Sequence, residues 1–178
     1  MAKRAFDLSK VYGLLEPGPL VLLTTAHKGR VNVMMMSWHA MMEFAPPLVG
    51  CIVSGGDLSF GPLTATRQCA LNVPTVELAA KVVGCSNLSG RRVDKFEAFG
   101  LTPAPAPLVG APLSPQCYAN LECRVFDTRL VKRHNFFVFD VLKAWMDPAC
   151  KEPRTRHHRG RGLFMVAGET IKVPSKMK

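Results

Sequence analysis

The chain has 178 residues, of which 48% are apolar and 20% are charged. These values are ordinary for a globular protein, so the composition excludes a wholly disordered chain and predicts a single domain over residues 1–178. Only 8% of the residues are aromatic. Such a low aromatic content argues against a long stacking platform for single-stranded nucleic acid.

Positive charge is concentrated in the last third of the chain. The formal net charge is +10, to which residues 1–123 contribute +2 and residues 124–178 contribute +8. A basic segment at about 147–178 suits an anionic partner such as a phosphate, a dinucleotide, nucleic acid or another protein. A solvated basic surface is the alternative that charge alone leaves open.

The sequence predicts a soluble, cytoplasmic protein with neither a membrane segment nor a metal site. No apolar run reaches the roughly 18 residues of a membrane helix, and the first ten residues, MAKRAFDLSK, lack the apolar stretch of a signal peptide. The six cysteines form no C-x-x-C pair, so we expect buried thiols and no disulfide framework. Adjacent His157 and His158 stand among arginines, which would repel a cation.

Short β-rich runs separated by turns dominate the first part of the chain. Strands are expected at residues 20–26, 31–42, 48–54 and 69–73, and helices at 58–66, 75–83 and 94–99. Residues 27–30 are typical of a hairpin turn, and the run 31–42 is long enough to require a bend or bulge. Asp57 and Thr75 are predicted to cap the first two helices.

The remainder of the chain favours an antiparallel barrel. Prolines mark residues 101–116 as an extended connector that lies against the domain. Strands are expected at residues 121–130 and 136–144, followed by a polar, basic stretch to 162 and an apolar run at 163–167. Six or so short strands with small inserted helices predict a mainly β, closed or nearly closed barrel. A parallel sheet is excluded because the first strands are joined too tightly for crossovers.

Three stretches carry polar residues in unusual settings, although no dinucleotide-binding glycine motif, Walker loop or nucleophile elbow occurs. Asn, Ser and Trp interrupt an apolar strand at 32–38. Hydroxyls, cations and the backbone N–H groups around Gly90 make residues 85–96 a plausible anion cradle. His134 heads an apolar strand. Each stretch also has a purely structural explanation. The polar residues at 32–38 could pair with the local backbone, residues 85–96 could be a loop with solvated charges, and His134 could be an ordinary structural histidine.

In order and spacing, these stretches and several others resemble the flavin reductase-like proteins, and more closely their flavoredoxin branch. The resemblance runs from about residue 18 to 172. Its segments are 21–25, 32–38, 46–49, 72–74, 89–96, 121–123 with the His134 strand, and 162–168. One departure is Phe139-Asp140, where the family often has Gly-Glu.

This resemblance implies an FMN-binding split barrel, which is a six-stranded antiparallel Greek-key barrel. It is usually a homodimer with flavin at the subunit interface. The cofactor-binding positions that it implies are Asn32, Met35, Ser37, Trp38, Ser54, Ser59, Asn72, Val73, Ser89, Arg91, Lys95, His134 and Phe164. Lys95 and His134 are the implied catalytic residues, because a cation near the flavin ring stabilises its anionic reduced form.

The resulting hypothesis is an oxidoreductase that passes electrons from NAD(P)H or a redox protein through bound FMN to an acceptor. One alternative is an electron carrier of the same fold without NAD(P)H activity. Another is a basic module that contacts nucleic acid through residues 151–161. That reading ranks last, and no specific nucleic-acid partner is expected, because no recognition motif accompanies the charge.

Overall fold

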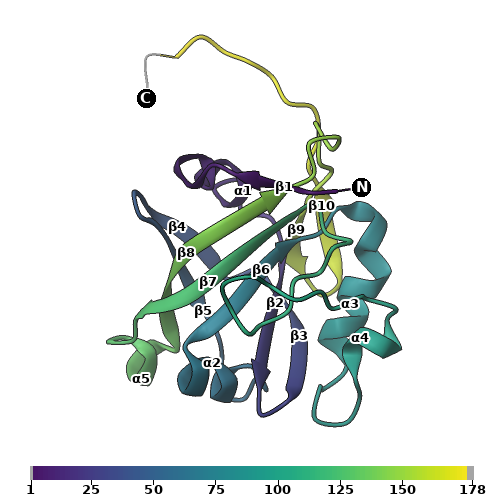
Figure 1. The fold of residues 1–178 in the computed structure, drawn as a ribbon. Coiled ribbons are helices and arrows are strands. Elements are labelled where there is room, and N and C mark those ends of the chain that lie inside the picture. Colours follow the sequence, from purple (N-terminus) through teal and green to yellow (C-terminus); the bar gives the residue numbers. More distant parts are fainter. Residues whose placement is uncertain (1, 176–178) are drawn as a thin grey trace.

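An antiparallel sheet of eight strands dominates the structure, a computed structural model that describes residues 2–175 (Figure 1). The strands are β1 (Arg4–Phe6), β2 (Val21–His27), β3 (Arg30–Met36), β4 (His39–Phe44), β5 (Pro47–Ile52), β6 (Gln68–Val73), β7 (Ala119–Asp127) and β8 (Phe136–Met146). Their order is β3-β2-β6-β7-β8-β5-β4, and β1 pairs with the end of β8. Every pairing is antiparallel, as the tight connections predicted.

One bent strand closes this sheet into a barrel. β3 and β4 occupy opposite ends of the strand order, yet they are consecutive in the chain and are joined only through Ser37 and Trp38. At the corner, the backbone N–H of Ile52 donates to the carbonyl of Trp38 over 3.0 Å. With β3 and β4 counted as one strand, the closed path has six strands, which confirms both the barrel and the bend predicted within residues 31–42.

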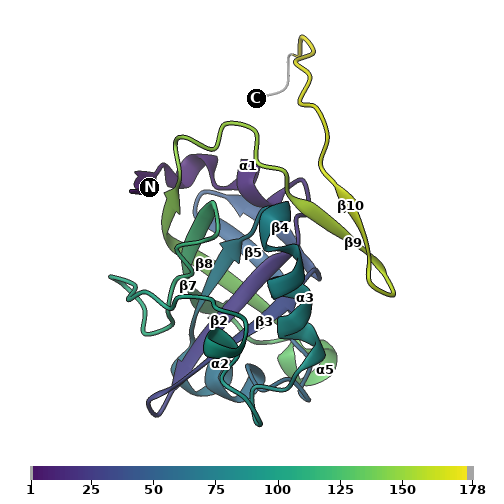
Figure 2. The same cartoon turned by 90° about the vertical axis from the view of Figure 1, so that its right-hand side faces the viewer.

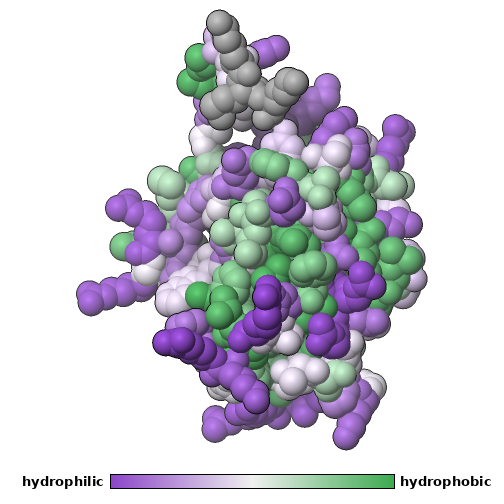
Figure 3. Space-filling view, turned by 90° about the vertical axis from the view of Figure 1, so that its left-hand side faces the viewer, coloured by the Kyte–Doolittle hydropathy of each residue, from purple (hydrophilic) through white to green (hydrophobic). Residues whose placement is uncertain are grey.

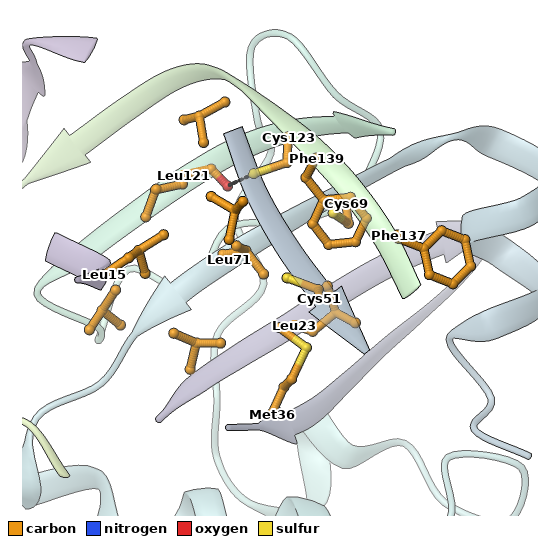
Figure 4. Packing of buried hydrophobic residues seen from close by; sticks show 14 of the residues in the cluster. Leu15, Leu23, Met36, Cys51, Cys69, Leu71, Leu121, Cys123, Phe137 and Phe139 are labelled. Carbon is orange, nitrogen blue, oxygen red and sulfur yellow. Dashed lines mark hydrogen bonds between the residues drawn. The ribbon is translucent and has the colours of Figure 1, made fainter. Parts of the chain in front are cut away.

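The barrel interior is filled by apolar side chains that alternate along the strands (Figure 4). Leu23, Leu71, Leu121, Phe137 and Phe139 are all fully buried there. The thiols expected to be buried are free, and all but the half-buried one at position 150 are buried, three of them in this barrel core. Burial raises the pKa of the thiols at positions 51 and 69 well above the ordinary value, so these groups behave as small apolar side chains.

Short helices cover the ends and one side of the barrel. They are α1 (Tyr12–Leu15), α2 (Phe60–Thr66), α3 (Ala79–Asn87), α4 (Lys95–Ala98) and α5 (Val131–His134), with 3-10 turns at Leu8–Lys10 and Val76–Leu78. In Figures 1 and 2, α3 lies beside β3. No helix within residues 2–175 combines the length and apolarity required to cross a bilayer.

Two predicted helix caps were wrong. The Asp57 carboxylate accepts the backbone N–H of Ser54 over 3.1 Å and so closes a turn, while α2 begins after Ser59. Thr75 makes no side-chain cap, because the chain first forms a 3-10 turn before α3 continues to residue 87. Asp94 does cap α4, and its carboxylate accepts the N–H of Phe96 over 2.8 Å.

Part of the basic stretch before residue 162, for which the sequence predicts no strand, forms a strand. β9 (Arg156–Gly160) pairs with β10 (Leu163–Val166) in a hairpin that projects from the barrel (Figure 2). Arg156 is buried, and its guanidinium lies 5.4 Å from the ring centroid of Phe164 with no hydrogen-bond partner among residues 2–175. Burial lowers its pKa. The basic segment is therefore not uniformly solvated.

A buried polar network fastens the proline-rich segment 101–116 to the barrel. The Asn72 side-chain oxygen accepts the Ser114 backbone N–H over 2.9 Å and the Asn120 amide over 2.7 Å. The Glu122 carboxylate accepts a backbone N–H of the segment over 2.6 Å. These bonds satisfy a stretch that has no helix or strand ladder of its own. The segment lies against the domain as an extended connector, as predicted.

We expect Asn72→Ala to destabilise the fold by about 2–3 kcal/mol, because it leaves the buried Ser114 N–H without an acceptor and removes one of the two acceptors of the Asn120 amide, which keeps only the Ser114 carbonyl. Chemical denaturation measures this loss. The double variant with Asn120→Ala should lose clearly less than the sum of the two single variants, since both changes break the same network. Additive losses would contradict the network.

Candidate functional site

A pocket of about 360 Å³ opens beside β3. Its walls come from β3, the loop at residues 56–58, the C-terminal half of α3, the loop that follows α3 and the first residue of α4. Segments that lie far apart in the sequence meet here because α3 packs directly on β3. Most of the pocket wall comes from residues 85–96 and 32–38. In the sequence, these two stretches were identified separately, each for its own polar residues.

Asn32 presents an unsatisfied hydrogen-bond acceptor in this pocket. Its amide nitrogen donates to the Ser59 hydroxyl over 2.9 Å, and the Thr25 hydroxyl approaches the same oxygen at 3.3 Å. The Asn32 side-chain oxygen is buried and has no partner in the described part of the chain. A buried acceptor without a donor costs about 1–3 kcal/mol. The described residues therefore supply no donor for this buried acceptor.

Gly90 permits the loop after α3 to approach Asn32. A Cβ atom at this position would overlap the Asn32 side-chain oxygen and press against Leu58. The Arg30 guanidinium holds the loop by donating to the Gly90 carbonyl over 2.7 Å and to the Arg91 carbonyl over 3.2 Å. Sequence reasoning assigned Arg30 only to a turn, since nothing in its neighbourhood indicates a loop sixty residues away.

Lys95 supplies a buried cation in the pocket wall. It is 7% exposed, and its ammonium donates to the carbonyl of Cys85 over 2.6 Å. Burial lowers the pKa of Lys95, an effect that the negative charge of Asp57 partly offsets. Lys95 therefore ties α4 to α3 and also places positive charge against the pocket. An anionic group in the pocket would be stabilised by this charge.

Phe164 packs against an apolar cluster that one residue of the pocket wall also contacts. Met35 is part of the pocket wall and also packs against a second apolar cluster on the outer face of β2 and β3. Phe164 of β10 packs against that cluster too. The hairpin thus brings an aromatic ring to the neighbourhood of the pocket without forming its wall.

The structure brings some of the expected site residues together and leaves others apart. The pocket is lined by Asn32, Met35, Ser89 and Lys95. Ser59 does not line it, but its hydroxyl accepts a hydrogen bond from the Asn32 amide. Ser37, Trp38, Ser54, Arg91 and His134 lie outside the wall, and all but the half-buried Ser37 are exposed.

Two of the expected residues face away from the pocket. Val73 is packed in the barrel core, and the Asn72 side chain is occupied by the network that holds the proline-rich segment. Asp57, in contrast, lines the pocket although the sequence predicted it only as a helix cap, and Cys85, the first residue of the predicted anion cradle, lines it too. Within residues 2–175, no three His, Cys, Asp or Glu side chains converge as metal ligands.

The fold and the pocket define the general class as a closed antiparallel β-barrel with a polar pocket beside β3. The chain belongs to the flavin reductase like domain family, whose model matches residues 14–163. It is 27% identical over 179 residues to the uncharacterized protein YddH of Escherichia coli (strain K12), with 93% of this chain and 95% of YddH covered.

Solved structures show the same fold. One is described as an FMN-binding domain of a flavin reductases-like enzyme from Shewanella baltica OS155; it superposes with a TM-score of 0.90 at 24% identity, covering 97% of this chain and 98% of that one. The flavoredoxin of Desulfovibrio vulgaris (Miyazaki F) gives a TM-score of 0.80 at 20% identity over 89% and 91% of the two chains. The resemblance drawn from the sequence and the predicted split barrel are both confirmed.

The lowered pKa of Lys95 makes a prediction about stability and pH. The folded state releases the Lys95 proton more readily than the unfolded chain, whose lysine titrates near 10.5. Between the two pKa values the unfolded state binds more protons, so the stability of the wild type rises with pH. Lys95→Met keeps the packing but removes this titration.

We therefore expect the wild type to gain stability relative to Lys95→Met as the pH rises from neutral to above about 10.5, the unperturbed lysine range. Urea denaturation across this range measures the difference. Lys28→Met, which changes an exposed lysine of the β2–β3 turn, is the matched control and should show no such trend. Parallel pH profiles for wild type and Lys95→Met would contradict the burial of this charge.

Proposed function

We propose that the protein is an FMN-binding oxidoreductase that receives electrons from NAD(P)H or from a redox protein and delivers them to an acceptor. The observation that carries this proposal is the unsatisfied Asn32 oxygen, which shares one pocket with the buried Lys95 ammonium and the closely approaching Gly90 loop. Membership of the flavin reductase like family supports FMN as the cofactor. The cytoplasmic location expected from the sequence stays a prediction.

The pocket residues fit the chemical groups of FMN. The cofactor has an N–H group and hydroxyls that can donate hydrogen bonds, which matches the missing partner of Asn32. It also has an anionic phosphate, which suits the Ser89 hydroxyl and the N–H groups beside Gly90. FMN, when bound, supplies the hydride and single-electron chemistry. The protein supplies the placement and the charge.

Lys95 is the group in this pocket that favours a reduced, anionic ligand. Its ammonium is fixed by the Cys85 carbonyl and is largely shielded from water. A unit charge about 4 Å away at an effective dielectric constant of 20 is worth about 4 kcal/mol before competing solvation. His134 is exposed at the end of α5 and lies outside the pocket wall. Its predicted role therefore requires contact with a ligand at the rim.

We also propose a homodimer with the flavin at the subunit interface. Apolar side chains gather on the face that carries β4 (Figure 3). Met42 and Phe44 are more than half exposed, and the rings of Tyr12 and Phe44 meet edge to face at 5.1 Å. Trp38, at the corner between β3 and β4, is 68% exposed. Covering this face with a second copy would bury apolar surface that water otherwise contacts.

The proposal predicts that the purified protein binds FMN and that Gly90→Ala weakens this binding at least about tenfold, since the added Cβ forces the loop away from Asn32 and one lost ligand contact costs about 1.4 kcal/mol or more. Fluorescence titration with FMN measures the affinity. Gly61→Ala adds the same atom where nothing lies within 4 Å, so it should bind FMN like the wild type. Failure of the wild type to bind FMN would overturn the proposal.

Electron delivery is tested separately from binding. We expect anaerobic NADH or NADPH to bleach the visible absorbance of the FMN-loaded wild type, because hydride transfer reduces the flavin. FMN-loaded protein that neither nucleotide bleaches, but that dithionite does, would contradict the NAD(P)H donor. That outcome would indicate the electron-carrier alternative.

A further inference from the structure

A second pocket of about 290 Å³ shares no wall residue with the first. It lies between the proline-rich segment and the paired ends of β1, β7 and β8. The segment forms one apolar wall with Ala104, Pro105, Pro107, Leu113 and Pro115. Trp145 of β8 lines the pocket as well, together with the polar side chains of Lys3 and Asn120.

The Trp145 ring is held in a fixed orientation. Its indole N–H donates to the Glu122 carboxylate over 2.9 Å, and the Lys143 ammonium lies 4.4 Å from the ring centroid. The other oxygen of Glu122 accepts a backbone N–H of the proline-rich segment. Both walls of the pocket are therefore tied to the same buried carboxylate. The pocket is therefore preformed and mostly apolar with a few polar groups, which is typical of small-molecule sites.

Lys3 places a cation without a counter-ion in this apolar setting. Its ammonium donates to the side-chain oxygen of Asn120 and, over 3.4 Å, to the Ser114 carbonyl, and both of these acceptors are neutral. Within residues 2–175 it forms no ion pair. The titratable groups that act on it electrostatically are Asp147 and Cys117, and burial outweighs them and lowers its pKa to about 8. An anion at Lys3 would remove this penalty.

We propose that this pocket binds a small apolar carboxylate, with its hydrocarbon part between Trp145 and the prolines and its carboxylate on Lys3. Glu122 does not compete for Lys3, because its two oxygens are already bonded to Trp145 and to the backbone of the proline-rich segment. The site is independent of the flavin pocket, so the proposal stands or falls separately from the proposed function.

The test uses the FMN-loaded, ¹⁵N-labelled wild-type protein and benzoate as the probe. The chain has only two tryptophans, so the two indole N–H resonances can be assigned with Trp145→Phe. We expect benzoate to shift the Trp145 resonance in a saturable manner while the flavin absorbance stays unchanged. Benzyl alcohol, a neutral molecule of similar shape, should bind at least about tenfold more weakly, the equivalent of about 1.4 kcal/mol.

Variants at two lysines test whether benzoate binding depends on the positive charge of Lys3 or only on the shape of the pocket. Lys3→Met should weaken benzoate binding at least about tenfold, and Lys3→Arg, which keeps the charge, should retain most of it. Lys143→Met, the matched control on the other contact of Trp145, should bind benzoate like the wild type. Because the carboxylate requires protonated Lys3, with its pKa of about 8, wild-type affinity should fall about thirtyfold between about pH 6.5 and about pH 9.5.

Several results would overturn the proposal. One is an unmoved Trp145 resonance, and another is equal binding of benzoate and benzyl alcohol. A third is benzoate binding that changes neither with pH nor in Lys3→Met. A change in flavin absorbance with no shift at Trp145 would place benzoate in the flavin pocket instead, which also overturns it.

Discussion

The barrel closes at the β3–β4 corner, and this closure positions the pocket and the elements packed around it. One strand pairs with β2 at its start and with β5 at its end, and the hydrogen bond from Ile52 to Trp38 joins the two edges. This closure leaves no unpaired edge along the barrel path. It also fixes Asn32 of β3 at a position where α3 and the Gly90 loop can pack over it.

Side chains that alternate along β2 take part in two different hydrogen-bond networks, one at the proline-rich segment and one around Asn32. Neighbouring residues of a strand point to opposite faces. Thr24 donates to the Pro112 carbonyl over 2.5 Å and belongs to the network that holds the proline-rich segment. Thr25 contacts Ser59, which holds Asn32 in the pocket beside β3. The two adjacent threonines therefore belong to two separate hydrogen-bond networks, one on each face of the strand.

Some of the basic side chains of this protein are largely buried. Lys3, Lys95 and Arg156 are each withdrawn from water to a large extent, and burial lowers the pKa of all three. None of them forms an ion pair within residues 2–175. Uncompensated buried charge is costly, so such groups are expected where an anionic ligand or partner completes the structure. Lys95 and Lys3 each line a pocket that can admit one.

The barrel, the bent strand and the stretches that line the pocket could be predicted from the sequence, because strand periodicity and turn chemistry are local properties and motif order can be read along the chain. Strands β1 and β9 were not predicted, because a three-residue edge strand and a run of arginines and histidines carry no strand pattern. The sequence did not predict that Asn72 turns to the proline-rich segment, that His134 lies outside the pocket wall or that Arg156 is buried. These outcomes depend on contacts between segments far apart in the chain, and local sequence does not encode which face of a strand its neighbours will cover.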